Sequence, residues 1–215
     1  MADQATIDQV VSGLHWLGHD CFRLDYSGGC LYFDPFELAG GPRADLILVT
    51  HEHFDHCVAE DVAKIAGPDT VILTEGQCAA KLAGRARLMK PGDVVEAAGV
   101  KVTATPAYNT DKDFHPKANN WLGFVVAVDG ATIYHAGDTD HIPEMADLDV
   151  DVALLPVSGT YVMTAEQAAG AARAINPRLA IPMHYGAIVG EQGDAEKFAQ
   201  ALAPDIPVRV LAKEA

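Results

Sequence analysis

The 215-residue chain is 49% hydrophobic and carries a formal net charge of −15. This length fits one large domain or two small ones, with enough apolar residues for a hydrophobic core. The negative charge disfavours a nucleic-acid partner, because it repels a polyanion. No stretch reaches the roughly 20 apolar residues of a membrane helix, and the acidic N-terminus lacks the basic start of a signal peptide. We therefore expect a cytoplasmic protein without a membrane partner.

Hydrophobic patterning predicts strands interspersed with helices. In chain order, strands are predicted at Leu14–Leu17, Cys21–Tyr26, Cys30–Phe33, Leu46–Thr50, Thr70–Thr74, Lys101–Pro106, Leu122–Val128, Thr132–His135, Val152–Val157, Ala180–His184 and Val208–Leu211. Helices are predicted at Val58–Ala66, Gln77–Leu82, Ala165–Ile175 and Ala195–Leu202. The third helix follows a capping-box pattern, Thr164 with Gln167 three residues later. Since no linker divides the chain, these elements indicate one layered α/β domain over residues 1–215.

Coordinating side chains crowd the segment that follows the apolar strand ending at Thr50. They are His51, Glu52, His53, Asp55 and His56. Buried imidazoles and carboxylates lose hydration unless something pairs with them, and a metal ion would do so. In extended backbone His51 and His53 project to the same side, whereas Asp55 and His56 point elsewhere as the chain turns. The segment therefore offers two ligand pairs, as two neighbouring metal ions require.

Two residues in the second half of the chain lie in a similar setting. Asp138 follows the strand at 132–135 and a glycine, and His184 ends the strand at 180–184. Taken alone, Asp138 is equally well read as a turn former, and His184 as a hydrogen-bonded structural histidine. Together with the first motif, they provide a carboxylate that can bridge two metals and an imidazole that completes the ligand set.

The order H-x-H-x-D-H, then Gly-Asp after a strand, then a late strand-end histidine resembles the metallo-β-lactamase fold superfamily over nearly the whole chain. The opening LGHDCFRLDYSGGCLYFDPF resembles the branch that holds the ascorbate-6-phosphate lactonase and the N-acylphosphatidylethanolamine phospholipase D. The resemblance implies a four-layer αββα sandwich with a metal site at one edge. It implies that the first metal is held by His51 and His53, the second by Asp55, His56 and His184, and that Asp138 bridges. The resemblance indicates almost nothing about the substrate.

One position departs from the family pattern. Asn109 stands where the family has a third histidine for the first metal, and amides are poorer zinc ligands than imidazoles. His115, six residues later, is a candidate replacement. Either His115 rebuilds the first site, or that site is weakened and the enzyme works with one tight metal. We favour His115.

The remaining candidate residues have weaker assignments. His19 and Asp34 are candidates for hydrogen bonding behind the ligands or for lining the pocket. The candidate substrate contacts are Lys112, Lys117, His141 and Tyr185. The four cysteines form no CxxC pair, so we expect reduced thiols.

These residues favour hydrolysis of a small ester, lactone or phosphoester by a metal-bound hydroxide, with Asp55 as the catalytic residue that orients it and transfers its proton. Imidazole and carboxylate ligands favour one or two Zn²⁺ ions, with Mn²⁺ or Fe²⁺ as alternatives. The expected partner is therefore a small-molecule substrate. Two other functions remain open, an iron-dependent oxidoreductase or dioxygenase of the same fold and a non-catalytic metal-binding protein, which Asn109 motivates. The oligomeric state is left open.

Overall fold

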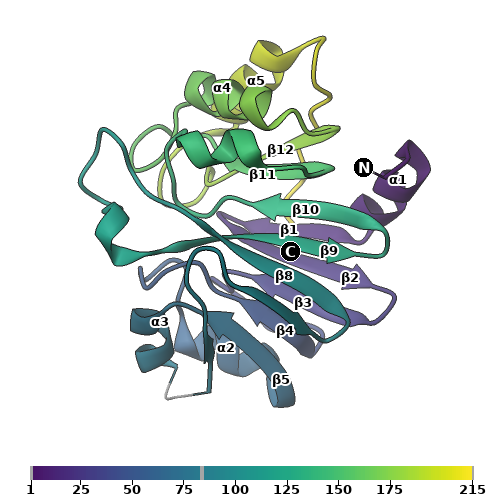
Figure 1. The fold of residues 1–215 in the computed structure, drawn as a ribbon, viewed down its shortest axis with the longest axis vertical. Helices are drawn as coiled ribbons and strands as arrows, with labels where there is room; N and C mark the ends of the chain where they lie inside the picture. Colours follow the sequence, from purple (N-terminus) through teal and green to yellow (C-terminus); the bar gives the residue numbers. More distant parts are fainter. Residues whose placement is uncertain (1, 83–84, 215) are drawn as a thin grey trace.

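The computed structural model describes residues 2–82 and 85–214, in which two six-stranded sheets form the centre of the molecule (Figure 1). The first sheet has the order β1 (Leu14–Gly18), β2 (Cys21–Tyr26), β3 (Gly29–Phe33), β4 (Ala44–Leu48), β5 (Ala66–Thr74) and β6 (Arg87–Leu88). The second has the order β12 (Leu179–Met183), β11 (Val152–Pro156), β10 (Ala131–His135), β9 (Leu122–Val128), β8 (Val100–Pro106) and β7 (Val94–Ala97).

Helices flank both sheets. α2 (Ala59–Ile65) and α3 (Gly76–Lys81) contact the first sheet, whereas α4 (Ala165–Ile175) and α5 (Gln192–Leu202) contact the second. α1 (Gln4–Ser12) lies beside β1 and β10 (Figure 1). Two short 3-10 helices, η1 (Lys117–Asn119) and η2 (Pro143–Asp147), lie in loops of the second half. This confirms the predicted α/β class with two central sheets and outer helices.

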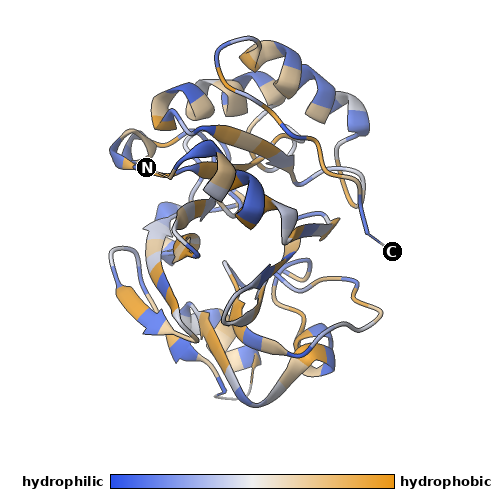
Figure 2. Ribbon diagram, turned by 90° about the vertical axis from the view of Figure 1, so that its right-hand side faces the viewer, coloured by the Kyte–Doolittle hydropathy of each residue, from blue (hydrophilic) through white to orange (hydrophobic). Residues whose placement is uncertain are grey.

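The alternation of side chains along β3 and β4 builds two hydrophobic clusters. Leu31 and Leu46 belong to the large core that joins the two sheets. Their neighbours Tyr32 and Ile47 point to the opposite face, where they pack with Val62 of α2. A strand buried on both faces reads as a continuous apolar run, which is why β4 was recognisable in the sequence. The helices at the top of Figure 2 mix hydrophilic and hydrophobic residues, as expected for helices with one face on a sheet.

The predicted capping box at the start of α4 is confirmed. The Thr164 hydroxyl accepts a hydrogen bond from the Gln167 backbone N–H at 3.2 Å, and the Gln167 side-chain oxygen accepts one from the Thr164 N–H at 2.9 Å. These two bonds satisfy backbone donors that the first turn leaves without partners. The start of this helix predicted from the sequence is therefore correct.

Several elements differ from the sequence prediction. α1 was not predicted, although its apolar residues bury against the core, and α5 starts at Gln192 rather than Ala195. β4 ends at Leu48 rather than Thr50. The predicted strand at 208–211 forms only an isolated bridge from Val208 to Ala180. Its residues are partly or fully exposed, so burial does not hold the rest of the segment against the sheet.

The expectation of reduced thiols is wrong for one pair of cysteines. Cys57, directly after the histidine-rich segment, and Cys78 of α3 form a disulfide with Cα atoms 6.1 Å apart. Cys21 and Cys30 are free and buried. The pairing arises because α3 packs behind the 51–57 segment, a long-range contact that cysteine spacing does not reveal. Among the described residues, no helix has the length and apolar character needed to cross a bilayer.

Candidate metal centre

The segments that follow six of the strands place polar residues at one edge of the two sheets. β1 and β3 run parallel to β4 in the first sheet, and β8 runs parallel to β10 and β12 in the second, so the carboxyl ends of each set lie together. The candidate residues follow these ends: His19 after β1, Asp34 after β3, the 51–56 segment after β4, His115 after β8, Asp138 after β10 and His184 after β12. Loops at this edge are where open α/β folds bind ligands.

Backbone conformations at this edge are unusual. His19, Asp34 and His184 have φ values of 53°, 41° and 60°, in the left-handed region that side chains with a Cβ rarely adopt. Residues held there cluster at functional sites. Gly137 has φ of 62°, and a Cβ at this position would lie 2.7 Å from the Leu122 carbonyl oxygen. The turn that presents Asp138 therefore requires glycine.

Asp138 lies at the centre of the cluster. One of its carboxylate oxygens, Oδ2, is 3.1 Å from His115 Nε2, 3.2 Å from His184 Nε2 and 3.9 Å from His51 Nε2. The other, Oδ1, is 3.5 Å from His56 Nε2. Asp138 is 4% exposed. A carboxylate that faces imidazoles through both oxygens has the geometry of a bridging ligand.

Four imidazoles are fixed through their Nδ1 atoms. The partners are Thr50 Oγ1 for His51 (2.9 Å), Asp34 Oδ2 for His56 (2.8 Å), Asn109 Oδ1 for His115 (3.0 Å) and Ser158 Oγ for His184 (2.8 Å). Metal-binding histidines are typically held this way, with the second ring nitrogen left for the ion.

The opposite ring nitrogens fit a metal ion. The Nε2 atoms of His56, His115 and His184 are buried and make no hydrogen bond, and the same holds for Asp138 Oδ1. Leaving such groups buried without partners costs free energy. Their convergence on one another gives a donor set of the kind that Zn²⁺ and related ions bind. The residues present therefore fit a metal centre.

Two of the groups of potential ligands share no residue. The first consists of His51, His53, His115 and Asp138, and the second of His19, Asp55, His56 and His184. Within each group, the potential ligand atoms all lie within 4.8 Å of one another. The structure thus brings together the six residues with the strongest assignments from the sequence, and it adds His19 to the second group. His19 Nε2 is 3.1 Å from Asp55 Oδ2.

His115, and not Asn109, reaches the first group. The Asn109 side-chain oxygen accepts hydrogen bonds from the His115 backbone N–H (2.9 Å) and side chain, while its amide nitrogen donates to the Tyr161 carbonyl oxygen at 3.0 Å. His115 is 1% exposed, although it lies in a loop. Asn109 therefore positions His115 through these hydrogen bonds, while Nε2 of the ring faces Asp138.

The charges of the cluster suit metal binding. Burial lowers the pKa of His51 well below its usual value and also lowers that of His53, so both imidazoles are neutral. Burial opposes ionisation of Asp138, but His184 and His56 hold its pKa well below the usual value. Burial also disfavours the charged form of His56, yet Asp138 and Asp34 raise its pKa well above the ordinary value. Metal ions require neutral imidazoles, so an ion must displace the His56 proton.

Asp20 is a member of the cluster that the sequence analysis missed. It is 0% exposed, neither carboxylate oxygen has a hydrogen-bond partner, and it groups with His56, Asp138 and His184. Burial, followed by the nearby Asp138 charge, raises the pKa of Asp20 well above its usual value. Burial therefore favours the uncharged carboxyl group, and a bound cation would favour the charged one. A single aspartate in a turn gives no local signal, which is why the sequence did not reveal this residue.

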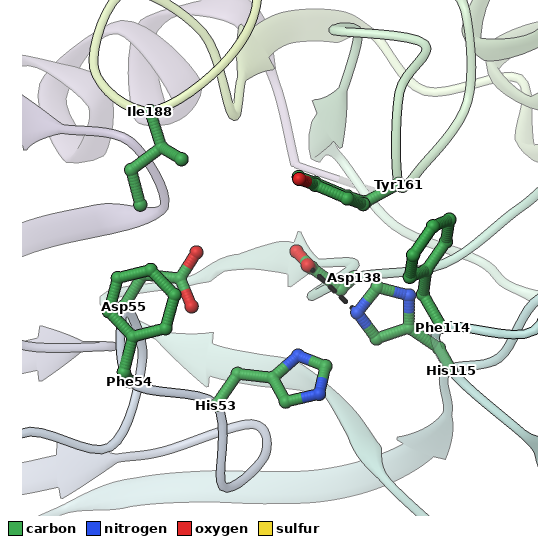
Figure 3. A pocket seen from close by; sticks show the side chains of 8 residues that line it. All are labelled: His53, Phe54, Asp55, Phe114, His115, Asp138, Tyr161 and Ile188. Atoms are coloured by element: carbon green, nitrogen blue, oxygen red, sulfur yellow. Dashed lines mark ion pairs between the residues drawn. The ribbon is translucent and has the colours of Figure 1, made fainter.

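A cavity of about 220 Å³ opens onto the cluster (Figure 3). Its lining consists of His53, Phe54, Asp55, Phe114, His115, Asp138, Tyr161 and Ile188. The polar members are among the residues predicted from the sequence, whereas Phe54, Phe114, Tyr161 and Ile188 are not. Nothing in their local pattern distinguishes them from other loop residues, since their proximity arises only in the folded chain.

The four predicted substrate contacts lie outside this lining. Lys112 pairs with Asp111 and Asp140, each at 2.7 Å, and Lys117 pairs with Glu144 at 2.9 Å. His141 is exposed and does not line the cavity. Tyr185 is 1% exposed and stacks on Trp16, with ring centroids 4.7 Å apart. Ion pairs hold Lys112 and Lys117, and burial holds Tyr185, outside the cavity lining. Substrate contact by these four residues stays a prediction.

Asp34, predicted to hydrogen-bond behind the ligands, lies in such a position. Besides His56 Nδ1, it accepts hydrogen bonds from the Thr50 N–H and hydroxyl, both at 2.7 Å. It therefore connects the end of β3 to the start of the histidine-rich segment.

Comparison with known proteins gives one consistent family. A family model described as "Beta-lactamase superfamily domain" matches residues 13–184. A protein of Pyrococcus abyssi named as a UPF0173 metal-dependent hydrolase is 36% identical, over 91% of this chain and 94% of that protein. A crystal structure of a provisionally named metal-dependent hydrolase from Parabacteroides distasonis has a TM-score of 0.84 and 36% identity, covering 92% of this chain and 91% of that one. A metallo hydrolase from Ignicoccus hospitalis has a TM-score of 0.77 and 25% identity, covering 94% and 95%.

Proposed function

Because the chain belongs to the β-lactamase superfamily and to its group of metal-dependent hydrolases, we propose that it hydrolyses a small ester, lactone or phosphoester with the help of one or two bound metal ions. The single observation that carries this proposal is the set of buried, unpartnered Nε2 atoms around Asp138. The narrower resemblance to the lactonase and phospholipase D branch stays a prediction.

We assign the ligands by the two groups of potential ligand atoms, with Asp138 between them. His51, His53 and His115 would hold one ion, Asp55, His56 and His184 the other, and Asp138 would bridge them. The donor set contains imidazoles and carboxylates without thiolate, which favours Zn²⁺ over softer ions, with Mn²⁺ and Fe²⁺ as alternatives. In such a site a metal supplies Lewis-acid chemistry, since binding to Zn²⁺ lowers the pKa of water from about 15.7 to about 7.

Asp55 has the position and charge of the catalytic base. It lines the cavity, and its Oδ2 lies 3.1 Å from His19 Nε2. Burial raises the pKa of a carboxyl group, but here the hydrogen bond from His19 outweighs it, together with the His56 charge, so the pKa of Asp55 is lowered. At neutral pH the carboxylate is ionised and can accept a proton from an attacking water and deliver it to the leaving oxygen. His19 would keep Asp55 oriented during this transfer.

The names of the relatives favour a hydrolase over the oxidative alternative. The non-catalytic alternative rested on Asn109, and its support weakens because the Asn109 side chain holds His115, which completes the donor set. We also propose that residues 1–215 act as one hydrolase domain, supported by the hydrophobic core that the two sheets share.

The test is removal and return of the metal. Purified protein would be stripped with a chelator and assayed against esters, lactones and phosphodiesters before and after adding Zn²⁺ or Mn²⁺, with metal content measured in each sample. We expect turnover to disappear with the metal and to return with it. Turnover in a demonstrably metal-free sample would contradict the proposal, as would full metal occupancy without hydrolysis of any class in the panel.

A further inference from the structure

Apolar side chains gather at the mouth of the metal-centre cavity. Among the described residues, five large hydrophobic side chains are exposed, and three of them line this cavity: Phe54 (72% exposed), Phe114 (49%) and Ile188 (40%). They come from three different loops, after β4, between β8 and β9, and after β12. Figure 3 shows them around the opening. Clustered exposed apolar groups beside polar residues mark binding sites.

The phenylalanine of the 109–120 loop is held in place. The ring of Phe114 packs edge-on against Tyr161 with centroids 4.7 Å apart. The next residue, His115, is anchored by Asn109. A rigid aromatic wall adjacent to a metal-site histidine can hold an apolar substituent at a fixed distance from the reacting atoms.

Apart from the proposed metal ions, no cationic side chain is found among the described residues that line the same cavity. None of the residues in its lining is Lys or Arg. The basic side chains of the neighbouring loop are neutralised, Lys112 by Asp111 and Asp140, and Lys117 by Glu144. Recognition of a phosphate or a carboxylate normally uses Arg, Lys or a cluster of backbone N–H groups. An anionic substituent at this rim would also meet a protein with a net charge of −15.

We propose that the substrate is an uncharged carboxylic ester or lactone whose short apolar substituent sits between Phe54, Phe114 and Ile188. This inference rests on the proposed hydrolase function and narrows it. The cavity, at about 220 Å³, is smaller than the roughly 300–1,000 Å³ of pockets that enclose drug-sized ligands, so the enclosed substituent is small.

The reaction is a simple hydrolysis. The oxygen of water forms a bond to the acyl carbon, and the bond from that carbon to the alkoxy oxygen breaks with its electron pair. One proton of the water goes to the leaving alkoxide through Asp55, and the other is released when the carboxylic acid product ionises. No oxidant or further reactant is needed.

The test compares substrates that differ only in the acyl group. Metal-loaded protein would be assayed with p-nitrophenyl acetate, butyrate and hemisuccinate, and with bis(p-nitrophenyl) phosphate. We expect kcat/KM to rise about tenfold from acetate to butyrate, because two more methylene groups are buried, and to fall at least as much for hemisuccinate. Equal or better turnover of hemisuccinate or of the phosphodiester would overturn the inference.

Substitutions at the rim test whether Phe114 causes the preference for butyrate over acetate and hemisuccinate. Phe114→Ala should raise KM for butyrate and reduce the butyrate-to-acetate ratio towards one, with metal content unchanged. Phe114→Lys should shift preference towards hemisuccinate. The matched control is Val94→Ala, since Val94 is 53% exposed on β7 and lies outside this cavity lining. An unchanged ratio in Phe114→Ala would overturn the inference.

Failure of the proposed function and failure of this inference give different results. If metal-loaded protein hydrolyses no compound of any class, the proposed function fails. The rim is then tested by binding alone, through NMR titration of the metal-loaded protein with butyramide and with succinamate. Binding of the neutral amide at the rim residues supports the inference, and equal or stronger binding of the anion contradicts it.

Discussion

At the scale of single residues, the contrast between two neighbouring carboxylates is informative. Asp55 lines the cavity and pairs with His19, whereas Glu52 is half-buried and pairs with Lys81 at 2.7 Å. We expect Asp55→Asn to reduce kcat about 10²–10⁴-fold, because the residue acts in proton transfer. Glu52→Gln, the control, should change kcat less than twofold. Equal losses in both variants, or none in either, would contradict the role of Asp55.

The pair His115 and Asn109 gives a second prediction. His115→Ala should remove one metal ion from a protein that binds two, because the Nε2 atom that faces Asp138 disappears. Asn109→Ala should keep the stoichiometry at saturating metal but weaken the affinity about 10–100-fold, as expected when a ligand loses its orienting hydrogen bond. Metal titration with elemental analysis distinguishes the two effects. Loss of an ion only in Asn109→Ala would mean that asparagine is the ligand.

The protonation of His56 predicts a pH dependence of metal binding. Although burial disfavours the charge, Asp138 and Asp34 raise the pKa of His56 well above its ordinary value, so the metal-free imidazole carries a proton at neutral pH. The pKa of Asp138 is lowered, so that carboxylate is already ionised. Binding should therefore release about one proton from His56, and affinity should fall about tenfold for each pH unit below its raised pKa.

Calorimetric titration in buffers with different ionisation enthalpies measures this proton release. Because the pKa of Asp20 is also raised, the Asp20→Asn variant separates its contribution from that of His56. Affinity that does not change between pH 6 and neutral pH would contradict the prediction.

At the scale of elements, the disulfide connects the histidine-rich segment to α3. Cys57 follows His56 directly, and the Cys78 sulfur also lies 3.5 Å from the His51 carbonyl oxygen. The bond closes a loop across a sequence separation of 21. We expect reduction, or the Cys57→Ser/Cys78→Ser double variant, to lower the free energy of unfolding by about 3 kcal/mol. Chemical denaturation measures it.

A thiol titration provides the control for the disulfide. Unfolded, unreduced protein should show the two free thiols of Cys21 and Cys30, and reduction should add those of Cys57 and Cys78. Four reactive thiols without reduction would show that this pair does not form.

Elements with a strong local signal were predictable from the sequence. β4 was recognisable because both of its faces are buried, and α4 because Thr164 and Gln167 cap it. α1 was not, since a helix of nine residues gains its stability mainly from packing its apolar side chains on the core. The segment at 208–211 has β-branched residues but lacks the burial that would make it a strand.

At the scale of the whole molecule, the sequence predicted the layered fold and the residues that converge at its edge. It could do so because those residues lie in the segments that follow buried strands. It left the choice between His115 and Asn109 open, since only the folded 109–120 loop turns His115 towards Asp138. It missed Asp20, a single aspartate in a turn, and the apolar rim, whose side chains come together from three loops only in the folded chain. Residues that reach the centre through tertiary contacts carry no local pattern.

The centre is composed of residues from both sheets, His51 to His56 from the first and His115, Asp138 and His184 from the second. The proposed hydrolysis therefore depends on metal ions held between the two sheets. Anomalous X-ray diffraction from crystals grown with Zn²⁺ tests this most directly. We predict one or two peaks beside Asp138, at about 2.0–2.1 Å from the Nε2 atoms of His56 and His184 and, for a second ion, of His115. Zinc bound only at other positions, with these nitrogens free, would contradict the account.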